Sequence, residues 1–311
     1  MIRPLAIAVM LTPIAASAAD ANPLAVDAKI PLGDVSGRID HLAFDPTRER
    51  LYVAELGNNS VGVVDLKARR VLRTVAGFEE PQGIGYEPST DTIYVANGGD
   101  GSVRLFSGAD FAALGNIPLG KDADNVRIDR AAKRVYIGYG DGALAVIDPA
   151  TRKRIGDIPL KGHPESFQLD PTGDSIFVNV PDAGHIAIVS RDGKQQVAMW
   201  PTGSLRANYP LALDMDKGRA ISVFRHPAQL QSYDIRSGRA LNGIAALEWL
   251  YRPTNWPFGP VQRGRCQHLY GGMHRRLLEE AQWKREHEGA ERAQAIAKQA
   301  RDLRKERGWA P

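Results

Sequence analysis

The segment Ile93-Tyr94-Val95-Ala96-Asn97 is the clearest indication of the fold, because altered copies of it recur along the 311-residue chain. Counted from Tyr52 to Ile221, equivalent positions are spaced 41 to 44 residues apart, and an acidic residue lies seven positions before each. A fixed period of this kind is the mark of a repeat protein. The other copies are Leu51-Tyr52-Val53-Ala54, Val135-Tyr136-Ile137-Gly138, Ile176-Phe177-Val178-Asn179 and Ala220-Ile221-Ser222-Val223, and the acids are Asp45, Glu87, Asp129, Asp170 and Asp214.

Each repeat has the pattern of four short strands. In the first repeat, alternating β-branched and aromatic residues fill 41–45, 50–54, 60–65 and 71–75, with Gly, Asn, Asp and Pro around them. These are the signals of strands joined by tight turns. Four strands in 40–45 residues is the size of one propeller blade. The sequence therefore predicts an all-β fold, a β-propeller of four-stranded antiparallel blades with five recognisable repeats.

The segment Tyr94-Val95-Ala96-Asn97 resembles the motif that names the YVTN β-propeller repeat family. The resemblance extends from about residue 24 to 247. It implies an exported propeller, in a family whose rings usually have seven blades closed by the two ends of the chain. It implies little about function, because blades pack alike whatever their loops bind.

Before the first repeat, Lys29-Ile30-Pro31-Leu32-Gly33 matches segments of two later repeats, at residues 116–120 and 157–160, that are predicted as outermost strands. We therefore expect residues 29–33 to be the outer strand of a blade whose inner strands lie elsewhere. After Arg239 only one more strand, around 241–244, fits the pattern. An unclosed arc would leave blade edges open, which favours oligomerisation.

The last part of the chain, residues 248–311, forms a predicted non-propeller tail with a helix at about 273–307, where Glu, Ala, Gln, Lys and Arg dominate. Three interpretations stay open: foreign sequence joined by a frameshift or fusion, an appendage that contacts a partner, or a basic segment that binds an anionic surface.

The N-terminus has the pattern of a signal peptide over residues 1–19, with the repeat domain over 20–247. Arg3 precedes an apolar run over 5–16, and Ala16-Ser17-Ala18 provides a cleavage pattern. No later stretch is apolar enough for a membrane span, so we expect a periplasmic or secreted protein. A single cysteine, Cys266, allows no internal disulfide.

The net charge of +4 comes from 40 Lys and Arg against 36 Asp and Glu. The whole surplus lies in residues 240–311, whereas the repeats are nearly balanced. Because nucleic-acid binding needs a basic surface, it is not expected of the propeller.

Polar residues recur where the loop of each repeat leads into the innermost strand. A propeller gathers such loops around its centre, so these side chains are predicted to form one central face for a small-molecule ligand or a protein partner. The alternative is that they cap strand ends within their own loops. The candidates are Asp40, His41, Gln82, Asp124, Asn125, Glu165, Ser166, Asn208 and Tyr209, with Arg225 after the second strand of the fifth repeat.

Two functions follow from this face. The first is a binding or scaffold protein without covalent chemistry, favoured because the sequence holds no Gly-x-Ser-x-Gly, His-Glu-x-x-His or phosphate-loop motif. No organic cofactor is expected, but oxygen ligands suit Ca²⁺ or another divalent cation. The alternative is a metal-dependent hydrolase similar to gluconolactonase propellers, with a cation held by Glu165, Asn125, Asn208 and Asp40. His185, at the start of a third strand, is expected to be an exposed structural residue.

Overall fold

The computed structural model describes residues 26–192 and 196–245. They form five four-stranded sheets, and all strand pairs within them are antiparallel. In the first two blades the strands are β1 (Leu42–Asp45), β2 (Arg50–Glu55), β3 (Ser60–Asp65), β4 (Arg70–Ala76), β5 (Pro81–Glu87), β6 (Thr92–Asn97), β7 (Ser102–Ser107) and β8 (Ala113–Pro118). A short 3-10 turn, η1 (Leu56–Asn58), joins β2 to β3.

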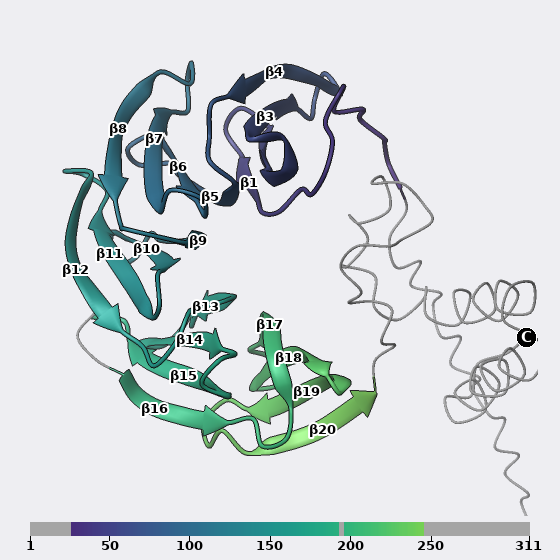
Figure 1. Ribbon diagram of the computed structural model, residues 1–311, viewed down its shortest axis with the longest axis vertical. Coiled ribbons are helices and arrows are strands. Elements are labelled where there is room, and N and C mark those ends of the chain that lie inside the picture. The colour runs from purple at the N-terminus through teal and green to yellow at the C-terminus, as the bar shows by residue number, and fades with distance from the viewer. Residues whose placement is uncertain (1–25, 193–195, 246–311) are drawn as a thin grey trace, which may run out of the picture.

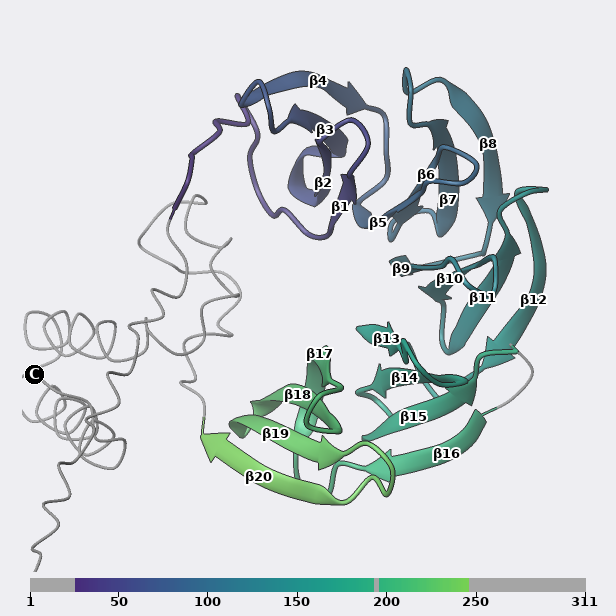
Figure 2. The ribbon, with the colours of Figure 1, turned by 180° about the vertical axis from the view of Figure 1, so that it is seen from behind.

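The remaining three blades repeat the same order from innermost to outermost strand. Their strands are β9 (Ala123–Asp129), β10 (Arg134–Tyr139), β11 (Ala143–Asp148), β12 (Lys153–Pro159), β13 (Phe167–Leu169), β14 (Ser175–Val180), β15 (His185–Ser190), β16 (Gln196–Pro201), β17 (Arg206–Asp214), β18 (Arg219–His226), β19 (Ala228–Asp234) and β20 (Ala240–Ala245). The blades stand side by side in an open arc, with the first strand of each blade toward its centre (Figures 1 and 2). The predicted all-β propeller architecture of five four-stranded blades is confirmed.

The repeated aromatic residue packs each blade against the next. Tyr52 shares a buried cluster with Ile84 and Val95 of the second blade, and Tyr94 does the same with Val126 and Val135 of the third. Tyr136 and Phe177 continue the series toward the fourth and fifth blades. All four aromatic side chains are buried. Because neighbouring residues of a strand point to opposite faces, the residues beside Tyr94 and Tyr136, such as Val95 and Ile137, pack against the preceding blade instead.

The repeated acid closes the turn between the first two strands of each blade. Asp45 Oδ1 accepts hydrogen bonds from the backbone N–H groups of Thr47 and Arg48, at 2.9 and 3.2 Å. Equivalent bonds to turn N–H groups are made by Glu87, Asp129, Asp170 and Asp214. The acids are therefore conserved within the repeats as turn caps, at the equivalent positions that the sequence predicted.

Two arginines in turns between strands also join neighbouring blades, Arg48 between β1 and β2 and Arg191 after β15. Arg48 forms ion pairs with Asp45 and, in the second blade, with Asp91, each at 2.8 Å. Arg191, in the fourth blade, donates to Asp129 Oδ1 of the third at 2.7 Å. It also donates to the carbonyls of Asp170 and Gly173, both at 3.0 Å. Burial alone would raise the pKa of Asp129, but the contact with Arg191 holds that pKa below its usual value.

Two sequence expectations are corrected. Residues 29–33 do not form a strand, because the part of the chain that is described contains no inner strands for them to pair with. His185 begins β15 as expected but is buried, with 1% exposure. The third strand of a blade is flanked on both sides, here by β14 and β16, and its faces are covered by neighbouring blades.

Predictions for the signal peptide (1–19) and for the tail (248–311) concern residues outside those described. Within residues 26–192 and 196–245, no helix is long and apolar enough to cross a membrane.

The first blade leaves apolar side chains uncovered on one face. Ala43 points toward the second blade and packs on the core they share. Leu42 and Phe44, on either side of it, point to the opposite face and are 54% and 47% exposed. Among the described blades, none precedes the first one, so this face is where the arc begins (Figure 2).

Replacing Arg191 by Ala is expected to lower the free energy of unfolding by about 3 kcal/mol, because it leaves the fully buried Asp129 carboxylate without its partner. Lys217→Ala breaks an exposed pair with Asp214 and serves as the control, with an expected loss of at most about 0.5 kcal/mol. Urea unfolding at neutral pH measures both. Equal losses in the two variants would show that the Arg191 pair does not hold the blades together.

Candidate functional site at the central face

Five of the predicted site residues occupy one repeated position. Each lies five residues before the turn-capping acid of its blade, where a loop leads into the innermost strand. They are Asp40, Gln82, Asp124, Glu165 and Tyr209. Because the innermost strands β5, β9, β13 and β17 stand on the concave side of the arc, their leading ends face its centre (Figure 1).

Contacts between loops link the first three blades. His41 Nδ1 lies 3.2 Å from Asp40 Oδ1 and 3.8 Å from Asp124 Oδ1. Its backbone N–H donates to the carbonyl of Gln82 at 3.2 Å. Arg38 contacts the Asp40 carboxylate and donates to Gln82 Oε1 at 3.4 Å. The structure thus brings together four predicted residues, Asp40, His41, Gln82 and Asp124, which with Asn125 and Glu165 we name the central cluster.

A second line of contacts extends the central cluster toward the fourth blade. Gln82 Nε2 donates to Asp122 Oδ1 at 3.1 Å, and His163 Nδ1 lies 3.6 Å from Asp122 Oδ2. Two residues beyond His163 stands Glu165. Burial raises the pKa of the Glu165 carboxyl to about 7, and the charges of Asp124 and Asp122 add to the rise.

The pKa of His41 is also displaced. Burial alone would lower it, but the hydrogen bond to Asp40 and the charge of Asp124 raise it above its ordinary value. Burial likewise raises the pKa of Asp124. Groups whose protonation is poised by burial and by neighbouring charges are a frequent sign of a functional site.

Asp124 and Asn125 carry the least satisfied polar atoms of the central cluster. They are 6% and 2% exposed, and Asn125 Nδ2 donates to Asp124 Oδ2 at 3.1 Å. Asp124 Oδ1 and Asn125 Oδ1 accept no hydrogen bond from any described residue. Since buried polar atoms nearly always have partners, two adjacent acceptors without donors require an explanation.

The other four predicted residues, Asn208, Tyr209, Arg225 and Ser166, make other contacts. Asn208 is fully buried, and its amide donates to Asn179 Oδ1 at 3.0 Å and to the carbonyl of His185 at 3.3 Å, between the fourth and fifth blades. The Tyr209 ring lies 3.9 Å from the guanidinium carbon of Arg225, which stacks on it. The carbonyl of Ser166 accepts a strand-end hydrogen bond from the Asn179 N–H.

These positions bear on the predicted cation ligands Glu165, Asn125, Asn208 and Asp40. The Nδ2 of Asn208 donates into the contact between the fourth and fifth blades, whereas its Oδ1, the atom that would bind a cation, is buried and accepts no hydrogen bond from any described residue. Among residues 26–192 and 196–245, no three His, Cys, Asp or Glu side chains form a group that could hold a metal ion. Cation binding by the four residues stays a prediction.

Sequence reasoning missed Arg38, Asp122 and His163, which complete the contacts of the central cluster. All three lie in the same loops as the candidates, within two residues of one. Each stands two residues before a candidate, further from the strand than the residues predicted for the site. Their charge or titratable side chain, considered over the whole loop, is the signal that could have identified them.

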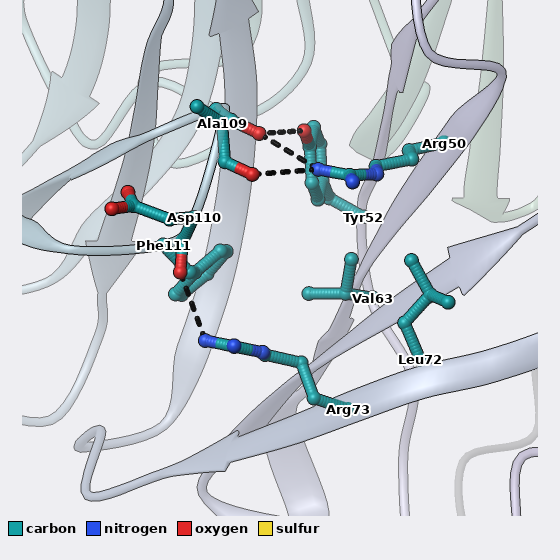
Figure 3. A pocket seen from close by; sticks show the side chains of 9 residues that line it. Arg50, Tyr52, Val63, Leu72, Arg73, Ala109, Asp110 and Phe111 are labelled. Atoms are coloured by element: carbon teal, nitrogen blue, oxygen red, sulfur yellow. Dashed lines mark hydrogen bonds between the residues drawn. The ribbon is translucent and has the colours of Figure 1, made fainter.

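A pocket between the first and second blades lies at the opposite end of the strands (Figure 3). Arg50 Nη1 donates to the carbonyls of Gly108 and Ala109, each at 3.0 Å, and Arg73 Nη1 donates to that of Asp110 at 2.9 Å. These arginine contacts hold the turn of one blade against the strands of the other. The pocket therefore belongs to the packing between blades.

Blades and central face together define the class of the protein, a β-propeller. No family model and no curated protein matches the chain. Among solved structures, it is similar to hydrazine synthase of Kuenenia stuttgartiensis, with a TM-score of 0.60 and 16% sequence identity over 69% of this chain and 67% of that one. At this identity the likeness supports the fold alone.

The variant Glu165→Gln is expected to gain thermal stability relative to the wild type as pH rises. The folded protein holds the Glu165 proton up to about pH 7, whereas the unfolded chain releases it near 4.5. Ionisation in this interval therefore lowers wild-type stability, and a glutamine has no proton to lose. Melting temperatures at pH 5 and pH 8 measure the effect.

The control is Asp182→Asn, which removes an exposed carboxylate at the same end of the fourth blade. Its difference from the wild type should be the same at both pH values. A Glu165→Gln difference that is also independent of pH would contradict a raised Glu165 pKa.

Proposed function

We propose that the protein is an exported binding protein whose central face holds a small polar ligand. The observation that carries the proposal is the contact of loops from separate blades in one cluster of polar side chains. A purely local role would leave each polar side chain bonded within its own loop. Export follows from the signal-peptide pattern, which makes the periplasm or the exterior the expected location.

Binding without covalent chemistry is favoured over the hydrolase alternative. The hydrolase alternative requires Glu165, Asn125, Asn208 and Asp40 around one cation. The Asn208 side chain donates to Asn179 and to the carbonyl of His185, between the fourth and fifth blades, and none of its hydrogen bonds involves the central cluster. The central cluster contains Asp, Asn, Gln, His and Glu side chains that interact through hydrogen bonds or through charge, which suits recognition of a polar ligand.

A ligand of the central face is expected to bind at least about tenfold more weakly to Asp40→Asn than to the wild type, because Asp40 orients Arg38 and His41 through charged contacts. A thermal-shift screen of small polar compounds with the full-length protein identifies the ligand, and calorimetry measures its affinity. Asp182→Asn should bind like the wild type. A ligand that binds Asp40→Asn and Glu165→Gln as tightly as it binds the wild type would place the binding site outside the central cluster.

The same proposal includes self-association through the uncovered face of the first blade. Exposed Leu42 and Phe44 can be buried only against another surface, and burial of apolar area is favourable. The double variant Leu42→Ser, Phe44→Ser is expected to shift the protein toward monomer, as measured by light scattering after size exclusion. Ile155→Ser, which removes an equally exposed residue from an outermost strand, is the control. An unchanged oligomer distribution in the double variant would exclude this face as the interface.

A further inference from the structure

We propose that the central cluster selects a small organic cation, and that Asp124, Asn125 and Glu165 bind its ammonium group. The inference rests on the proposed ligand-binding function and specifies the chemistry of the ligand.

The first argument is the set of acceptors. Asp124 Oδ1 and Asn125 Oδ1 are buried and receive no hydrogen bond from the described residues. The Glu165 carboxylate, near enough to Asp124 for their charges to interact, makes no side-chain hydrogen bond within that part of the chain either. An ammonium group has three N–H donors and no acceptor. Three acceptors without donors therefore match its hydrogen-bonding capacity.

The second argument is charge. The carboxylates of Asp40, Asp122, Asp124 and Glu165 influence one another across the central cluster. The cations nearby are engaged: Arg38 pairs with Asp40, and His41 lies beside both Asp40 and Asp124. Arg127 donates to the carbonyls of Phe167 and Val126, and Arg225 stacks on Tyr209. None of these four cations donates a hydrogen bond to the Asp124 or Glu165 carboxylate, so an ammonium group would add a charge-assisted hydrogen bond to both.

The geometry favours an organic cation over a metal ion. Ca²⁺ takes six to eight oxygen ligands in a compact shell. The acids here come from loops of separate blades, and no three His, Cys, Asp or Glu of the described residues form a group that could hold a metal. An ammonium group needs fewer acceptors, and a ligand several atoms long can reach acids on different loops.

Binding should depend on the protonation of Glu165, whose proton a bound ammonium would displace. The charged groups around Glu165 are Asp122, Asp124, His163, Arg38 and Arg225. Those around Asp124 include Asp40, His41, Arg38 and Arg127. Because the pKa of Glu165 is about 7, most molecules hold that proton at pH 6 and few do at pH 8. The apparent affinity for the ammonium group falls in proportion to the fraction of molecules in which Glu165 is ionised.

The test uses three probes of equal chain length with the full-length protein: 1,4-diaminobutane, 1,4-butanediol and succinate. Calorimetry at pH 8 should show binding of the diamine alone, about tenfold weaker at pH 6. Asp124→Asn should weaken the affinity at least about tenfold, and Glu165→Gln should remove the pH dependence. Asp182→Asn, the matched control, should leave both unchanged, and melting curves confirm that the variants fold.

Several outcomes would overturn the inference. Binding of the diol or succinate without the diamine would refute a cationic ligand while leaving a polar binding site in place. Absence of diamine binding, or diamine affinity unaffected by Asp124→Asn, would also refute it. If Ca²⁺, added as CaCl₂, binds more tightly than the diamine and prevents the diamine from binding, then the acceptors are metal ligands. The wider proposal of ligand binding is judged separately, by the compound screen.

Discussion

A four-stranded blade has two apolar faces and can bury them only against other blades. The repeated aromatic residue meets this constraint in one direction: Tyr52, Tyr94, Tyr136 and Phe177 each pack toward the following blade. The fifth copy of the position is Ile221, beyond which no described blade follows. Ile221 is partly exposed, and Leu42 at the other end of the arc is 54% exposed, because no described blade covers either face. The core of this protein is thus a series of shared interfaces between blades.

The same stacking produces the chemistry of the central face. When blades pack side by side, the loops before their innermost strands meet, and side chains that are far apart in sequence become neighbours. The chain between His41 and Asp124 spans two blades, but His41 Nδ1 lies 3.8 Å from Asp124 Oδ1. Packing also removes these groups from water, which is why burial is the main cause of the raised Glu165 pKa. A scaffold built for packing therefore supplies an electrostatic environment that no single repeat has.

Register shifts occur in three of the blades where the innermost strand begins. They lie between Pro81 and Gly83 in β5, between Ile137 and Tyr139 opposite the start of β9, and between Asn208 and Leu211 in β17. In the second and third blades Gln82 and Asp124 contact residues of other loops, whereas Asn208 donates into the contact between the fourth and fifth blades. Counting along the chain cannot reveal such bulges, because they form only when two strands pair.

The blades, the strand order within them and the equivalent positions of the repeated acid could be predicted from the amino-acid sequence, because they depend on periodic local patterns of apolar and turn residues. The sequence also indicated the loops that would meet at the centre. The capping bonds of the repeated acid became visible only in the folded chain, as did the burial of His185, the absence of a strand at residues 29–33 and the acceptor oxygens without donors on Asp124 and Asn125. These properties depend on what other blades place around a residue, and burial and electrostatic interaction are sums over neighbours in space.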